Sequence, residues 1–129
     1  MLYNMCGLNV YYEPKYKQTI TRSEKYLAKN QNLKPDIILN VTEERIDNYI
    51  LSFPHISRSL AEYVIYGMIF YEAILDYDGI LLHSSAISVD NEAYLFTANS
   101  GTGKSTHCAL WMKYFGNRAV MINDDKPVI

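Results

Sequence analysis

The residues best suited to chemistry lie between Ala98 and Ser105, where two glycines precede a lysine and a serine. This stretch follows the phosphate-binding P-loop pattern of Gly, four residues, then Gly-Lys-Ser, except that Ala98 replaces the first glycine. Glycines let backbone N–H groups turn toward a phosphate, Lys104 can reach the outer phosphates, and the Ser105 hydroxyl can ligate magnesium. The pattern therefore predicts a site for ATP and Mg²⁺. The residues expected to bind this cofactor are Asn99, Ser100, Gly101, Thr102, Gly103, Lys104, Ser105 and Thr106.

An alternative reading of this segment is a glycine-rich turn that enters a helix and binds nothing. The Cβ of Ala98 favours the alternative, because it restricts the first turn of the loop. The context favours the phosphate site. An apolar strand is expected at residues 94–96 and a helix at residues 104–115, and strand, loop and helix are the order that the motif requires.

Two adjacent carboxylates, Asp124 and Asp125, follow the apolar run of residues 119–123. A strand that ends in Asp supplies the second half of a P-loop site when it lies beside the P-loop strand and brings a carboxylate to magnesium. Asp124 follows Lys104 by 20 residues, enough for one helix, one turn and a parallel strand. Neighbouring residues on an extended chain point to opposite faces, so one Asp could hold the metal while the other accepts a proton from a hydroxyl substrate. The alternative is a solvated turn before Pro127.

Other elements must hold this site in place. Apolar residues repeat at intervals of three and four over residues 59–76, which predicts an amphipathic helix that stops at Gly79. Thr42 is a suitable N-cap for a helix that runs to about Leu51. A short helix is expected at residues 23–29. Extended segments are expected at residues 8–12, 36–41, 80–83, 85–89 and 93–96, the last as a buried strand after a turn at residues 90–91.

Residues 82–127 resemble the catalytic core shared by HPr serine kinase/phosphorylase and ATP-dependent phosphoenolpyruvate carboxykinase. Three features carry the resemblance: Leu82-His83, the run from Ser100 to Thr106, and Asn123-Asp124-Asp125. HPr kinase-like proteins are the most similar group, since Ser-Gly-Thr-Gly-Lys-Ser-Thr-His and Asn-Asp-Asp-Lys-Pro recur there. The carboxykinases carry a Glu-His continuation that is absent here, and HPr kinases usually have glycine at the position of Ala98.

The resemblance implies roles for individual residues. His83 would lie near the reacting phosphate, Asp124 would be the base toward a substrate serine, and Asp125 would be a magnesium ligand, with the exchange of the two aspartates left open. For His83 the alternative is a partly buried strand histidine bonded to backbone. His107 is expected to pack on or near the surface of its helix.

Composition narrows the classes of partner and the compartment. The chain has 129 residues, a net charge of -2 and no run of Lys or Arg, which argues against a nucleic acid or an anionic membrane as partner. The apolar stretch at residues 60–75 is too short and too polar to span a membrane. Residues 1–10 do not form a signal peptide, and Cys6 and Cys108 form no disulfide framework, so a cytoplasmic location is expected. The 12 tyrosines are expected in the core or in an interface, which makes a homo-oligomer plausible.

Taken together, these features predict an α/β protein whose P-loop lies in a mixed sheet with flanking helices. Residues 1–78 are expected to form an α+β region, either accessory or the first part of the sheet, and residues 79–129 the start of a kinase core truncated at 129. The expected function is transfer of phosphate from ATP to a serine hydroxyl of a protein or peptide. The alternatives are a non-catalytic nucleotide-binding module or fragment, and a small-acid kinase or carboxykinase.

Overall fold

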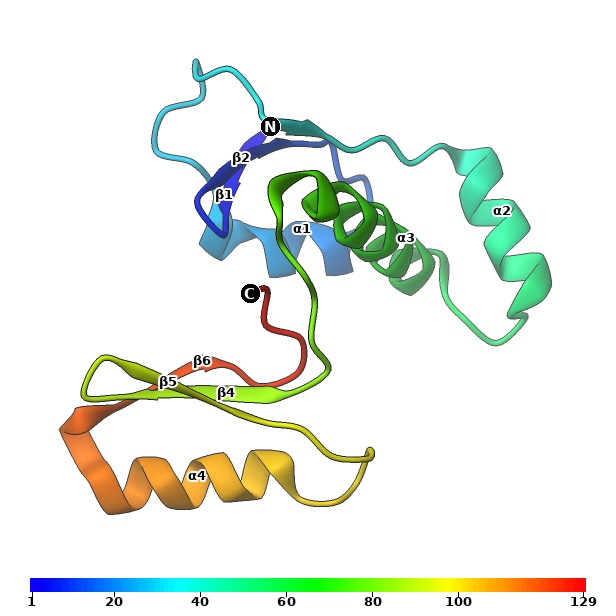
Figure 1. Cartoon of the computed structure of the whole chain (residues 1–129). Coiled ribbons are helices and arrows are strands. Elements are labelled where there is room, and N and C mark those ends of the chain that lie inside the picture. Colours follow the sequence, from blue (N-terminus) through cyan, green and yellow to red (C-terminus); the bar gives the residue numbers. More distant parts are fainter. The chain divides into compact units, whose positions relative to one another are not determined.

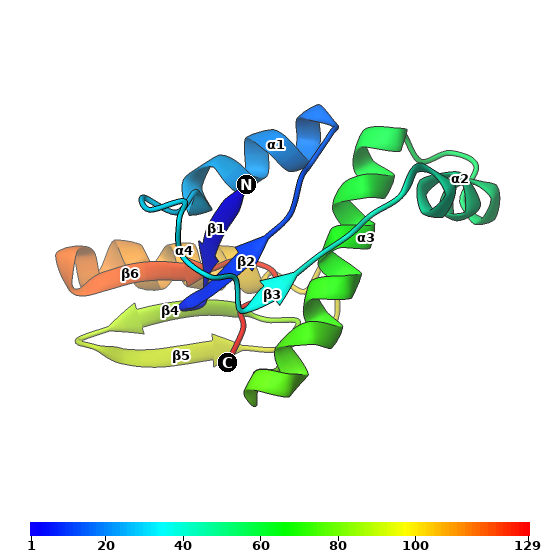
Figure 2. The same ribbon diagram turned by 90° about the horizontal axis from the view of Figure 1, so that it is seen from above.

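The computed structural model describes residues 1–129, which divide into two compact units, Met1–Asp78 and Gly79–Ile129 (Figure 1). The chain is α/β, with one small three-stranded sheet in each unit and four α-helices (Figure 2). No helix combines the length and the apolar character that crossing a membrane would require.

The first unit holds a mixed sheet in the order β1-β2-β3. β1 (Leu2–Met5) and β2 (Leu8–Tyr11) form a hairpin whose turn uses the left-handed conformations of Cys6 and Gly7, and β3 (Ile37–Ile38) pairs with β2 in parallel. β1 was not expected from the sequence, and β3 is much shorter than the segment at residues 36–41. The helical elements of this unit are α1 (Lys17–Ser23), η1 (Glu24–Tyr26), α2 (Glu43–Ser52), α3 (Arg58–Ala73) and η2 (Ile74–Tyr77).

The helix expected at residues 23–29 is wrong, because α1 ends at Ser23 and only one 3₁₀ turn follows. The other two helices of the unit are confirmed. Thr42 caps α2 by accepting a hydrogen bond from the Arg45 N–H, and α3 with η2 covers the amphipathic segment. The left-handed residue that ends this segment is Asp78, with φ of 56°, rather than Gly79.

Buried tyrosines form part of the core of the first unit. The rings of Tyr3 and Tyr12 stack with centroids 4.2 Å apart, and Tyr66 lies 5.0 Å from Tyr12. The Tyr12 hydroxyl donates to Ser23 Oγ at 2.6 Å, and the Tyr66 hydroxyl donates to the Glu13 carbonyl oxygen at 3.2 Å. These residues confirm the expectation of tyrosines that bury the ring while the hydroxyl keeps a polar partner.

The second unit holds an antiparallel sheet in the order β5-β4-β6. The central strand β4 therefore separates β5 from β6, and the expectation that the strand before Asp124 lies directly beside the strand before the loop is wrong. The expected mixed sheet is likewise not found in this unit, where every strand pair is antiparallel. The elements are β4 (Ser85–Val89), β5 (Glu92–Phe96), α4 (Lys104–Phe115), η3 (Gly116–Arg118) and β6 (Ala119–Asn123).

One helix, α4, covers one face of this sheet (Figure 1). Its Cys108 is fully buried against Ile87, Val89 and Ala119 from the two neighbouring strands β4 and β6. β5 is an edge strand, and only Tyr94 and Phe96 turn toward the helix, so the expected buried strand is half exposed. Past the sheet, residues 80–84 pair with residues 125–129, with Leu81 and Val128 forming an isolated bridge in place of the strand expected at residues 80–83.

Candidate functional site

A loop of residues 97–103, here called the glycine loop, joins β5 to α4. Gly101 and Gly103 have φ of 79° and 92°, conformations that side-chain-bearing residues rarely adopt. A Cβ built on either glycine would meet no atom within 4 Å, so the positive φ, and not a lack of space, explains the glycines. Gly103 is also the N-cap of α4, so the loop leads directly into the helix.

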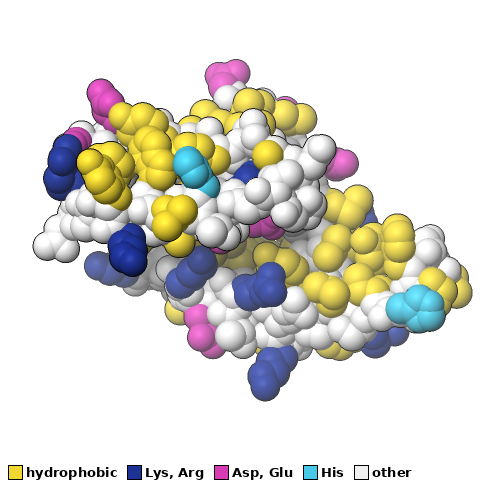
Figure 3. All heavy atoms as spheres, turned by 90° about the horizontal axis from the view of Figure 1, so that it is seen from below, with side chains coloured by type: hydrophobic (Ala, Val, Ile, Leu, Met, Phe, Trp, Pro, Cys, Tyr) yellow, Lys and Arg dark blue, Asp and Glu magenta, His cyan; other side chains and the backbone are white.

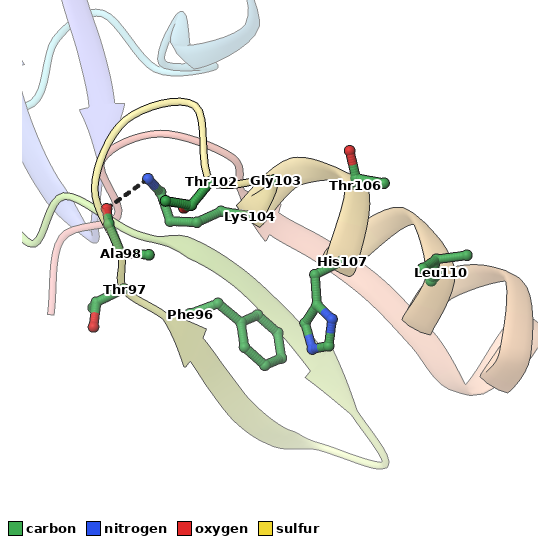
Figure 4. A pocket seen from close by; sticks show the side chains of 9 residues that line it. All are labelled: Phe96, Thr97, Ala98, Thr102, Gly103, Lys104, Thr106, His107 and Leu110. Atoms are coloured by element: carbon green, nitrogen blue, oxygen red, sulfur yellow. Dashed lines mark hydrogen bonds between the residues drawn. The ribbon is translucent and has the colours of Figure 1, made fainter.

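The Lys104 side chain folds back over this loop. Its Nζ donates to the carbonyl oxygen of Ala98 at 2.8 Å (Figure 4). It also donates to the carbonyl oxygen of Asn99 at 3.2 Å. The Thr102 hydroxyl also donates to the Asn99 carbonyl oxygen, at 2.8 Å. None of the chain's ion pairs includes Lys104. The hydrogen-bond partners of its ammonium group are two carbonyl oxygens of the glycine loop.

The N-terminus of α4 adds further hydrogen-bond donors to the loop. The first N–H groups of a helix have no partner inside it, and the first backbone bond of α4 is from the His107 N–H to the Gly103 carbonyl oxygen at 2.9 Å. No acidic residue occupies the first turn, so the positive end of the helix dipole is not offset there. Free donors and a positive helix end favour an anionic ligand.

The strand register brings the two halves of the expected site to the same end of the sheet. β5 and β6 are both antiparallel to β4 and therefore run in the same direction. Phe96 at the end of β5 pairs with Ser85, and Asn123 at the end of β6 pairs with Ala86. The glycine loop and the aspartate pair thus leave the sheet on either side of the first residues of β4 (Figure 1).

Asp124 lies on the side of the sheet that α4 covers. Its Oδ1 accepts a hydrogen bond from Ser85 Oγ at 2.8 Å. Burial raises the pKa of the Cys108 thiol, the negative charge of Asp124 raises it further, and a hydrogen bond with Ser85 lowers it. Cys108 lies three residues after Ser105 on α4, so the two residues share one side of the helix.

Asp125 has different neighbours. One of its carboxylate oxygens lies 3.7 Å from His83 Nε2, and the two side chains are 70% and 52% exposed. Asn123 Oδ1 accepts hydrogen bonds at 2.9 Å from the N–H groups of both Asp125 and Lys126, which fixes the turn after β6. His83 is therefore an exposed histidine beside a carboxylate and not a partly buried strand residue. The two aspartates do face different partners, as the sequence predicts.

The oxygen ligands near the glycine loop suit a magnesium ion that is bound together with phosphates, and not a metal ion held by side chains alone. No group of three or more His, Cys, Asp or Glu side chains in the chain could hold a metal ion. Magnesium takes oxygen ligands and is usually held by one or two carboxylates, with phosphates and water completing its shell. The hydroxyl of Ser105 and the carboxylate of Asp124 or Asp125 are ligands of that kind.

A pocket of about 470 Å³ adjoins the glycine loop. It is lined on the loop side by Thr97, Ala98, Thr102, Gly103 and Lys104, and on the other side by Phe96, Thr106, His107 and Leu110 (Figure 4). It is not lined by Ser105 or by the aspartates.

Sequence reasoning missed Phe96, Thr97 and Leu110 as site residues. His107 was expected to pack at the helix surface, and this is confirmed by its edge-to-face contact with Phe96 at 4.6 Å. The spacing of His107 and Leu110, three residues apart on one face of the helix, is the signal that could have found the pocket.

In comparisons with known proteins, no family model, curated protein or solved structure matches this chain.

Proposed function

We propose that the second unit binds the phosphates of ATP with Mg²⁺ and that the protein is an HPr kinase-like phosphotransferase acting on a serine hydroxyl of a protein or peptide. One observation carries the proposal: two glycines with positive φ lead into the N-terminus of α4, and carboxylates leave the sheet at the same end. Backbone donors, a lysine and a helix dipole favour a polyphosphate at the loop, and the carboxylates suit its metal.

Binding requires Lys104 to exchange its partners. Its ammonium now contacts two loop carbonyl oxygens, at 2.8 and 3.2 Å. A phosphate oxygen carries more negative charge than a carbonyl oxygen and makes a stronger hydrogen bond with an ammonium group. Lys104 would therefore turn from the loop carbonyls to the outer phosphates when the nucleotide enters.

The contacts of the two aspartates support exchanging the roles that the family resemblance implies. The charge of Asp124 acts on Cys108 of α4, and Ser85 orients the Asp124 carboxylate, so we assign it with Ser105 of the same helix to magnesium. The metal would neutralise phosphate charge during transfer. Asp125 beside His83 is exposed and open to an incoming acceptor, so we assign it as the base.

The proposed transfer is a direct displacement at the γ-phosphorus. The oxygen of the acceptor serine attacks the γ-phosphorus, and its proton passes to the Asp125 carboxylate. The bond between the γ-phosphorus and the bridging oxygen breaks, and ADP leaves with the electron pair. His83, at 3.7 Å from Asp125, can hold the carboxylate in position or relay the proton to water.

Nucleotide binding without transfer is a second candidate function. The 70% exposure of Asp125 favours it, because catalytic sites for phosphoryl transfer generally exclude water. Such a module would keep the roles of the loop, Lys104 and Asp124 but would leave Asp125 and His83 without a task.

Transfer from γ-labelled ATP to a serine-containing acceptor separates the two functions. With the full chain, we expect label transfer that Asp125→Asn abolishes while ATP affinity is retained. Asp124→Asn should instead raise the Mg²⁺ concentration needed for binding. Asp76→Asn, an exposed aspartate of η2, is the matched control. Normal transfer by Asp125→Asn would remove that residue from the base role, and binding without any transfer would favour the module.

A further inference from the structure

The pocket beside the glycine loop has an apolar wall that phosphates cannot use. Phe96 from β5 and Leu110 from α4 line it together with His107, and Leu110 is 59% exposed. Figure 4 shows the rings of Phe96 and His107 next to each other, below the loop that holds Lys104. An inorganic polyphosphate is charged throughout and would gain nothing from contact with these side chains.

The size and lining of the pocket suit a nucleoside. Its volume of about 470 Å³ lies within the usual range for small-molecule sites, which combine apolar walls with a few polar groups. Thr97, Thr102 and Thr106 are the polar, uncharged residues among its lining. No carboxylate lines the pocket, so an attached phosphate chain would meet no like charge there.

The pocket and the aspartates lie on opposite sides of the glycine loop, as a ligand that extends across the loop would require. β5 is an edge strand, so no other strand of its sheet closes that side of the site. The aspartates follow β6, which is on the opposite side of β4. A ligand whose phosphates lie in the glycine loop would thus have its metal on the β6 side and its remaining part on the β5 side.

We propose that this pocket holds the base and ribose of a nucleoside triphosphate, with the base against Phe96, His107 and Leu110, so that the site selects a nucleoside triphosphate over inorganic polyphosphate. This inference rests on the proposed function of the glycine loop. It adds a residue-level basis for the choice of phosphoryl donor, which the loop and the aspartates alone leave open.

Figure 3 shows hydrophobic side chains gathered around a histidine over α4. The helix therefore offers a control variant, because it carries a second exposed apolar residue outside the pocket. Leu110 and Tyr114 are both exposed on this helix, at 59% and 83%, but only Leu110 lines the pocket beside the loop. Leu110→Ser should therefore weaken a base contact, whereas Tyr114→Ser should not. Neither change removes a buried side chain, so both variants should fold.

The test is calorimetric titration of the full chain with Mg-ATP and, separately, with Mg-tripolyphosphate. We expect ATP to bind at least about tenfold more tightly, since contact of a base with an aromatic wall is worth roughly that factor or more. Leu110→Ser should lower ATP affinity about fivefold, the effect of losing part of one apolar contact, and leave tripolyphosphate affinity unchanged. Tyr114→Ser should behave as the wild type with both ligands.

Fluorescence gives a second readout. Trp111 is the only tryptophan, and its ring lies 5.2 Å from Phe96 and 5.9 Å from His107. ATP should change its emission and tripolyphosphate should not. Equal affinities for the two ligands, or an unchanged ATP affinity in Leu110→Ser, would overturn the nucleoside pocket while leaving phosphate binding intact. If neither ligand binds, the proposed function fails and this inference fails with it.

Discussion

Ser85 on β4 donates a hydrogen bond of 2.8 Å to the carboxylate of Asp124 at the end of β6. The bond joins the central strand of the second unit to the first residue after its neighbour. Both residues also act on the pKa of the buried Cys108 thiol of α4, which the charge of Asp124 raises and a hydrogen bond with Ser85 lowers. The orientation of the Asp124 carboxylate therefore depends on a residue outside every motif in the sequence.

Replacing Ser85 by alanine should misorient this carboxylate. We expect Ser85→Ala to cost about 1 kcal/mol of unfolding free energy, the usual net contribution of a hydrogen bond, and to weaken Mg²⁺-dependent ATP binding several-fold. Urea unfolding and calorimetry at varied Mg²⁺ would measure the two effects. Ser88→Ala on the same strand should change neither quantity. Equal losses of stability and ATP binding in Ser88→Ala and Ser85→Ala would contradict the assignment of this hydrogen bond to the orientation of Asp124.

The two cysteines should differ sharply in reactivity. Cys6 is exposed in the β1–β2 turn, whereas Cys108 is buried. Desolvation raises the pKa of both thiols, so access of the reagent, and not ionisation, separates them. A thiol reagent at pH 7.5 should label Cys6 quickly and Cys108 only on the timescale of unfolding. Cys6→Ser should remove the fast phase. Fast labelling of Cys108 in the native protein would contradict the packing of α4.

The first unit should lose stability in acid through Glu43. Hydrogen bonds from Arg58, Tyr16 and Lys15 lower the pKa of Glu43 to about 2 from its ordinary value of 4.5. A lowered pKa in the folded state means that the contribution is complete above 4.5 and is lost as the pH falls toward 2. Unfolding of Glu43→Gln should accordingly depend less on pH in this window than the wild type. Glu44→Gln, an exposed neighbour on α2, serves as the control, and equal pH profiles for all three proteins would refute the assignment.

The β4–β5 turn should tolerate glycine and reject branched residues. Asp90 and Asn91 have φ of 52° and 68°, the left-handed pair that a two-residue hairpin turn requires. Asn91→Val should cost roughly 1–2 kcal/mol of unfolding free energy, and Asn91→Gly should be neutral or stabilising. Thermal unfolding would compare them with Ala93→Val, which changes an exposed strand position of the same hairpin. A stable Asn91→Val would contradict the turn.

Local signals in the sequence predicted several elements well. The helix from Lys104 to Phe115 and the strand from Ala119 to Asn123 agree with the structure. The helix was expected from its place directly after the glycine-rich motif, and the strand from its apolar run. Thr42 was found from its residue type, since a hydroxyl before two glutamates is a typical helix start. Such features depend on neighbours in the chain and can be read from it.

Features that depend on distant residues could not be read in the same way. The insertion of β4 between β5 and β6 is a choice of strand pairing, which hydrophobic periodicity does not encode. The separate partners of the aspartates, Ser85 for Asp124 and His83 for Asp125, follow from that pairing. The pocket at Phe96 and Leu110 likewise exists only because α4 packs over β5.

The central claim is that the glycine loop binds the phosphates of ATP, and Lys104 tests it most directly. Isothermal titration of the full chain with Mg-ATP should give saturable binding. Lys104→Ala should weaken it about 10- to 100-fold, the effect of losing a charged hydrogen-bond donor, while Lys113→Ala in the last turn of α4 should not. Absence of binding by the folded wild-type chain, or equal affinities for Lys104→Ala and the wild type, would contradict the claim.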